Sequence, residues 1–364
     1  MILIAAVVCA TCTSLFAQKN SPASRENLLY PAPIRGKYGF INRHGKVAIH
    51  PRFDRVRLFT EGLAVVVNHD KYGYIDANGR GIIPIQFDEA APFSEGLAAV
   101  RVGEKWGYID KNGHWAIDPK FGTKLGGAGT FAEGLAPVSF QGQMGYVDYT
   151  GHFVIPPQFE FAEPFSEGLA AVGRVVQPNV SSLPVFGFID RAGRVVVPLQ
   201  YAGARPFREK LAVVSVYRAG VSFYPQAVID QTGTSVIPLS QAGIGDFHEG
   251  RALFGRGANG KFGFIDKAGK QLIPPKFLSI DDTGPSEFSE GLAAVSFSNG
   301  RAGYIDRAGR IVIPARFRIA CPFNGGIALV YSRNQVAYID KSGKHVWSVS
   351  NNDIPKDDEP DCNW

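Results

Sequence analysis

A unit of about 34 to 42 residues recurs nine times along this chain and constrains its fold more than any other feature. Each copy carries Gly-aromatic-Ile-Asp or a close variant, with a Gly three residues after the Asp in every copy, as in residues 107–113. A second motif, Phe-x-Glu-Gly-Leu-Ala, separates successive copies, as at residues 93–98. Because one unit is too small to bury a core alone, neighbouring copies must complete each other's core.

The unit at residues 97–117 predicts three short strands. Residues 97–102 are mostly apolar and suited to a strand, 103–105 form a turn, and 106–110 return as the second strand. A further turn at 111–113 leads to a third strand, which ends at Pro119 because proline cannot donate to a ladder. A less regular link containing a Phe follows, with room for a short fourth strand. The abundance of Gly (42) and Pro (24) suits such short strands better than helices.

The run Lys105-Trp106-Gly107-Tyr108-Ile109-Asp110, together with Glu-Gly-Leu-Ala, resembles the WG (KWG) β-repeat family. The resemblance covers about residues 36–347, although other copies hold Tyr or Phe at the Trp position and four depart from the aromatic type. It implies an all-β tandem array. The family has no assigned enzymatic activity, so the resemblance says little about function.

The repeats allow two arrangements. We predict an open, elongated array of stacked β-hairpins and meanders, because nine copies exceed the usual blade number of a propeller and their spacing drifts by up to eight residues. A closed β-propeller is the alternative, since three or four strands per unit would suit a blade.

The first 17 residues form an uncharged apolar run that is too short for a membrane span and ends at Ala17 before Gln18. We predict a signal peptide at 1–17, a linker at 18–35, the repeat array at 36–350 and an acidic tail at 351–364. The protein is then exported, to the periplasm, the cell surface or the medium. A lipid anchor or an uncleaved N-terminus is the alternative.

After cleavage Cys321 and Cys362 are the remaining cysteines, and in an oxidising compartment they can pair. A buried Cys321 with an unpaired Cys362 is the other reading. The net charge of +5 is spread along the repeats without basic runs, which argues against nucleic acid as a partner. No second apolar stretch is long enough to span a membrane, so we expect no membrane span after cleavage. We also expect a monomer.

A residue that recurs at one phase of every repeat is better explained by folding than by catalysis, which needs one site. The recurring Asp and Glu therefore predict turn-forming roles, and the scattered histidines show no metal-ligand spacing. We expect no cofactor, no metal and no catalytic residues. The sequence favours a non-enzymatic extracytoplasmic binding or scaffolding protein with a protein or cell-envelope glycan partner. A surface or periplasmic glycan-active enzyme is the alternative.

Two places could contact a partner. Trp106 and Tyr108 share one face of a strand, where they either pack in the core or line an exposed groove that could stack on sugar rings. Insertions into the repeat are the second place, because folding does not require them. The insertion at 216–226 mixes aromatic and basic groups, and further insertions occur at 122–130, 173–185 and 278–287. The possible partner-binding residues of the first insertion are Tyr217, Arg218, Phe223 and Tyr224.

Overall fold

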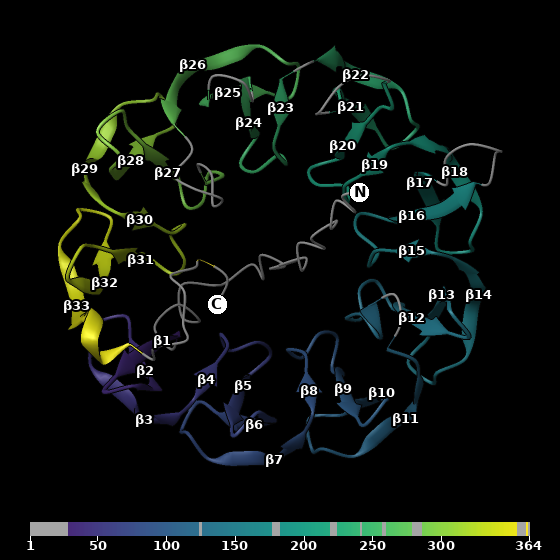
Figure 1. The fold of residues 1–364 in the computed structure, drawn as a ribbon, viewed down its shortest axis with the longest axis horizontal. Helices are drawn as coiled ribbons and strands as arrows, with labels where there is room; N and C mark the ends of the chain where they lie inside the picture. Colours follow the sequence, from purple (N-terminus) through teal and green to yellow (C-terminus); the bar gives the residue numbers. More distant parts are fainter. Residues whose placement is uncertain are drawn as a thin grey trace, which may run out of the picture.

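The computed structural model describes residues 28–123, 126–176, 183–218, 224–240, 242–256, 260–278, 286–354 and residue 362. The predicted signal peptide lies outside the described residues. The chain is built from small antiparallel sheets arranged around a ring, seen face-on in Figure 1. Eight sheets are present, and one of them joins two repeats, so the nine repeats form nine blades in the part of the chain that the structure describes.

Each blade is a meander whose strands step outward from the centre of the ring. In blade 3 the order from the rim inward is β11 (Trp115–Phe121), β10 (Lys105–Ile109), β9 (Ala98–Val102) and the two-residue strand β8 (Glu89–Ala90). The three-strand prediction is confirmed, and the innermost strand is the short fourth one. The other strands follow blade by blade: β1 (Leu29–Ile34), β2 (Lys37–Asn42), β3 (Val47–Phe53); β4 (Arg55–Val56), β5 (Leu63–Asn68), β6 (Lys71–Asp76), β7 (Gly81–Phe87); then blade 4, β12 (Ala136–Phe140), β13 (Gln143–Val147), β14 (Phe153–Phe159).

The second half of the ring repeats the pattern. Its strands are β15 (Phe161–Ala162), β16 (Leu169–Val176), β17 (Leu183–Asp190), β18 (Val195–Tyr201); β19 (Gly203–Ala204), β20 (Leu211–Ser215), β21 (Gln226–Asp230), β22 (Ser235–Ser240); β23 (Gly243–Ile244), β24 (Arg251–Arg256), β25 (Lys261–Asp266), β26 (Gln271–Leu278); β27 (Leu292–Ser296), β28 (Ala302–Asp306), β29 (Ile311–Phe317); and β30 (Ile319–Ala320), β31 (Ile327–Tyr331), β32 (Gln335–Asp340), β33 (His345–Ser350). A 3₁₀ turn (Asn351–Asp353) follows.

Two recurring turns shape the blades. In blades 2 to 5, 7 and 8 the Glu-Gly pair is a two-residue hairpin turn with φ > 0 at both residues, as at Glu95 (52°) and Gly96 (85°). Blade 6 has Glu209-Lys210 in this turn and blade 9 has Gly325-Gly326. The Asp-x-x-Gly turn is closed by the Asp carboxylate, so that Oδ1 of Asp110 accepts the backbone N–H groups of Asn112 and His114, both at 2.9 Å. The predicted turn-forming geometry of the Asp is present.

The hydrophobic core lies between blades. One cluster joins Tyr108 and Ile117 of blade 3 to Phe131 and Val138 of blade 4, and all four side chains are buried. Each blade therefore buries the face that its neighbour leaves open, as the short repeat requires.

The all-β tandem array is confirmed, and of the two arrangements the propeller is the one observed (Figure 1). Blade 9 returns to blade 1, where the Tyr338 hydroxyl donates to the Pro31 carbonyl at 2.9 Å and the Tyr30 and Tyr338 rings lie 5.6 Å apart. The preference for an open stack is thus corrected. The rotation from one blade to the next, about 40° for nine repeats, adds up to a full circle. The spacing drift is absorbed by loops outside the sheets.

The array begins earlier than predicted. Residues 29–34, placed in the linker from sequence, form β1 and pair along their whole length with β2. These residues lack the Glu-Gly-Leu-Ala motif. The strand can contain Pro31 and Pro33 because β1 pairs with β2 alone among the described strands. Within the described residues, no helix is both long and apolar enough to cross a membrane.

Candidate functional site

One face of the ring carries both recurring turns, and we call it the Glu-Gly face. The two turns approach each other across blade junctions, as where the Lys111 ammonium lies 3.1 Å from the Glu61 carboxylate. The opposite face carries the turns that lead into the Gly-aromatic strand of each blade, such as the turn between β9 and β10 in blade 3. We call it the loop face. Insertions 173–185 and 216–226 belong to the loop face, because they connect the corresponding strands in blades 5 and 6.

On the Glu-Gly face each Glu carboxylate binds the turn of the following blade. Glu249 of blade 7, for example, accepts the backbone N–H of Gly291 in blade 8, with its two oxygens 3.2 and 3.1 Å from that nitrogen. The Glu side chain thus satisfies a turn amide across the junction. The same bond joins Gly96 to Glu61, Gly134 to Glu95, Gly168 to Glu133, Lys210 to Glu167, Gly250 to Glu209 and Gly325 to Glu290.

Most of these carboxylates also contact the side chain of the residue that directly follows the recurring Asp in the next blade. Arg307 reaches Glu249 at 2.6 Å, and the Tyr149 hydroxyl donates to Glu95 at 2.9 Å. Ion pairs of the same kind join Lys111 to Glu61, Lys267 to Glu209 and Lys341 to Glu290. The recurring Glu therefore links neighbouring blades. The sequence predicts a role for this Glu only in its own turn.

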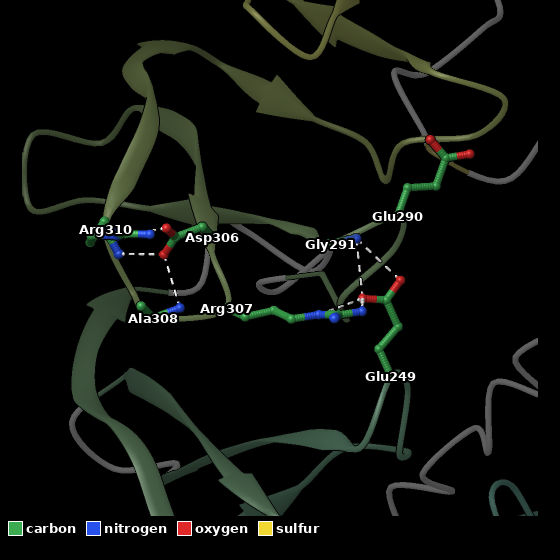
Figure 2. Close-up of a pocket in the computed structure, with 7 residues that line it drawn as sticks. All are labelled: Glu249, Glu290, Gly291, Asp306, Arg307, Ala308 and Arg310. Atoms are coloured by element: carbon green, nitrogen blue, oxygen red, sulfur yellow. Dashed lines mark hydrogen bonds and ion pairs between the residues drawn. The ribbon is translucent and has the colours of Figure 1, made fainter.

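Figure 2 shows the groove at the junction of blades 7 and 8, an open hollow of about 560 Å³ lined by Glu249, Glu290, Gly291, Asp306, Arg307, Ala308 and Arg310. Its acids are already engaged, because Glu249 holds Gly291 and Arg307 while Asp306 holds Arg310 at 2.7 Å. The backbone N–H and the guanidinium of Arg310 lower the pKa of Asp306, so its carboxyl is ionised at neutral pH. The groove offers paired charges to a polar ligand.

Blades 6 and 7 depart from the repeat at their inner edge. In blades 3, 5 and 8 a Ser after the conserved Phe donates to the next blade's Phe carbonyl, as Ser94 does to Phe131 at 2.8 Å. In blades 6 and 7 that Ser is replaced by a basic residue paired with an acid of the next blade. The pairs are Arg208 with Asp246 at 3.7 Å and His248 with Glu287 at 2.6 Å. Sequence reasoning missed this pair of matched substitutions, although their positions flank the conserved Phe in consecutive repeats.

The predicted loop residues gather on the loop face. The Tyr217 hydroxyl of blade 6 donates to the Pro184 carbonyl of blade 5, and the Tyr217 and Tyr224 rings lie 5.1 Å apart. Burial, with Tyr224 nearby, raises the pKa of Tyr217. Arg218 and Tyr224 are exposed. Phe223 lies outside the described residues. The two longest insertions thus meet in neighbouring blades, which the sequence did not indicate.

Trp106 and Tyr108 lie elsewhere. Tyr108 is fully buried and donates to the Gly129 carbonyl at 2.7 Å, and burial raises its pKa. A side chain without exposed surface cannot touch a partner, so Tyr108 is removed from the candidate binding residues. Trp106 is half-buried under Gly127, where any Cβ would collide with the indole nitrogen. Gly127 of the insertion at 122–130 therefore packs against the Trp106 ring.

Among the described residues, no group of three or more His, Cys, Asp or Glu side chains is placed to hold a metal ion. The family model described as "WG containing repeat" matches residues 38–72, 72–106, 106–142, 144–173, 186–217, 262–301 and 303–334. No curated protein sequence matches the chain.

Solved structures resemble the chain at low sequence identity. A structure titled "Crystal structure of the eukaryotic initiation factor" is 10% identical, with a TM-score of 0.63, over 89% of this chain and 96% of that one. BamB from Moraxella catarrhalis is 11% identical, with a TM-score of 0.41, over 79% of this chain and 94% of that one. At such identities the first likeness concerns the fold alone.

Proposed function

Because the chain belongs to the WG-containing-repeat family, whose repeats here close into a ring, we propose that it is a non-enzymatic binding or scaffolding protein outside the cytoplasm. Its partner is a protein or a cell-envelope glycan. The observation that carries the proposal is the meeting of insertions 173–185 and 216–226 through Tyr217 and Pro184 on the loop face. Tyr217 and Pro184 thus bring together two insertions that folding does not require.

The exposed residues of these insertions suit recognition. Arg218 and Tyr224 are exposed beside the half-buried Tyr217, and Tyr and Arg are the residue types that most often dominate binding energy at interfaces. Tyr217 is held by its hydrogen bond to Pro184 and its edge-on contact with Tyr224, so little rotational freedom remains to be lost on binding.

The non-enzymatic part of the proposal rests on the recurring acids. Their carboxylates hold turn amides and cations at successive junctions, and a carboxylate so engaged is a poor proton donor. The location outside the cytoplasm is supported by the apolar run at 1–17 and by the disulfide between Cys321 and Cys362, a bond that persists in oxidising compartments.

A binding screen tests the partner proposal. The purified chain is used to capture envelope proteins and to probe an array of envelope glycans, and the partner is then titrated against the double variant Arg218→Ala/Tyr224→Ala. We expect affinity to fall about tenfold or more. Trp115→Ala on β11 is the matched control, because its exposure of 40% is close to the 37% of Tyr224. Equal affinity of the two variants would refute the loop-face site.

The location is tested separately by N-terminal sequencing of the protein from its native cells. We expect a mature chain that begins at Gln18 and is recovered outside the cytoplasm. A full-length chain recovered from the cytoplasm would contradict the proposal.

A further inference from the structure

The junction between blade 9 and blade 1, which we call the seam, lacks two links found elsewhere in the ring. At every other junction the backbone itself continues from one blade to the next. In blades 2 to 8 a Glu also holds the following turn, but in blade 9 that position is Gly325. The sheets of blades 9 and 1 share no strand among the described residues, so ladder hydrogen bonds do not close the seam either.

Side chains close the seam instead. The Tyr338 hydroxyl donates to Pro31, the Tyr30 hydroxyl donates to the Asn324 carbonyl at 3.1 Å, and both rings belong to one buried cluster that spans the two blades. Gly325 is required there, since a Cβ at this position would collide with the Tyr30 hydroxyl. The seam is thus a packed aromatic contact without a covalent or ladder connection of its own.

The C-terminal segment fastens this contact. The Asp353 carbonyl accepts the backbone N–H of Gly36 in blade 1 at 2.8 Å, and Ile354 packs against the cluster of the seam. Cys362 packs against the same cluster and is disulfide-bonded to Cys321, which is 4% exposed in blade 9. One covalent bond therefore holds Cys362 against the cluster of the seam.

We propose that the Cys321–Cys362 disulfide is a redox-sensitive clasp that controls opening of the ring at the seam. The reductant is a dithiol, either a small molecule or a protein. One of its thiolates attacks a sulfur of the disulfide, and the S–S bond breaks to give a mixed disulfide and a cysteine thiolate. The second thiol of the reductant then resolves the mixed disulfide. Two electrons pass to the protein, which gains two protons as two cysteine thiols, and the reductant becomes a cyclic disulfide.

Burial sets the order of events. Cys321 lies inside the core of the seam, whereas Cys362 is partly exposed, so the attack occurs at the Cys362 sulfur and Cys321 leaves. Reduction frees Cys362 from Cys321, so that noncovalent contacts alone hold the seam. We expect β1 and β2 to loosen without loss of the other blades. This clasp does not depend on the partner proposed above.

Hydrogen exchange of the intact chain, oxidised and then reduced with dithiothreitol, tests the clasp. We expect amide exchange in β1 and β2 to rise about tenfold or more on reduction, while β13 in blade 4, on a far part of the ring, is unchanged. Alkylation followed by peptide mapping should label Cys362 before Cys321.

The variant Cys362→Ser is the control. It should show the fast exchange of the reduced protein at β1 and β2 and should not respond to dithiothreitol. Unchanged exchange at β1 and β2 in both the reduced protein and the variant would overturn the proposal. An equal rise in all blades would overturn it too, because the bond would then support the whole fold instead of the seam.

Discussion

Replacing Gly325 with Ala tests the packing of the seam. In the equivalent turns of other blades this position is a Glu at φ of about 50°, so an L-residue fits the backbone conformation. Only at Gly325, with φ of 62°, is the space taken, because a Cβ would collide with the Tyr30 hydroxyl and approach Leu28 to 2.5 Å. Overpacking of this kind costs about 1–3 kcal/mol, and loss of the bond from Tyr30 to Asn324 costs about 1 kcal/mol more.

Backbone strain at this positive φ adds about 1–2 kcal/mol. The expected loss in unfolding free energy is therefore about 3–6 kcal/mol, measured by urea denaturation with unchanged slope. Gly326→Ala is the matched control, because Gly326 lies in the same turn at φ of 91° and a Cβ added there would have no heavy atom within 4 Å. This substitution should cost only the backbone strain, about 1–2 kcal/mol. In a Tyr30→Phe background, which lacks the colliding hydroxyl, Gly325→Ala should cost at least about 1 kcal/mol less. Equal costs for Gly325→Ala and Gly326→Ala would refute the seam packing.

Two further outcomes follow from the structure. Tyr304→Phe should lower the unfolding free energy by about 1 kcal/mol in urea titrations, because the variant loses the hydrogen bond that the buried Tyr304 hydroxyl donates to the Cys321 carbonyl at 2.8 Å. Turn hydrogen bonds lower the folded-state pKa of Asp110 and Asp190 below the unfolded value. The stability that these carboxylates contribute should therefore be full above about pH 4 and should fall as the pH drops through the folded-state pKa. Urea midpoints that stay flat from about pH 7 to about pH 2 would contradict this.

Much of the blade could be predicted because its determinants are local. The Asp carboxylate bonds N–H groups two and four residues onward, and the turn glycines need φ > 0, so both leave a readable spacing. Alternating apolar residues and Pro119 likewise mark the strands and their ends. The three-strand meander follows from these signals alone.

Closure of the ring and the contacts between blades could not be predicted in the same way. The partner of the Glu249 carboxylate lies 42 residues onward in the next blade, and the partner of Tyr338 lies 307 residues back at Pro31. Such contacts depend on the angle between packed blades, which no local spacing encodes. Residues 29–34 were missed because β1 lacks the repeat's motifs, although its packing against blade 9 completes the ring.

The candidate site was predicted in part. The insertion at 216–226 could be found because it interrupts the repeat, but its contact with Pro184 depends on two neighbouring loops that face the same way. Tyr108 could not be separated from Trp106 by sequence, since both share one strand face, and only the structure shows that Tyr108 is fully buried. Pairing of Cys321 with Cys362 was one of two open readings, and the structure contains the disulfide.

Small-angle X-ray scattering of the purified chain tests the closed ring most directly. A compact chain of this length has a radius of gyration of about 21 Å, and a ring with an open centre should lie slightly above that value. Nine repeats stacked in line about 10 Å apart would extend about 90 Å and give a radius of gyration of about 26 Å or more. We predict about 21–23 Å with a pair-distance distribution that has a single broad maximum. A value near 26 Å with an extended tail would contradict closure between blades 9 and 1.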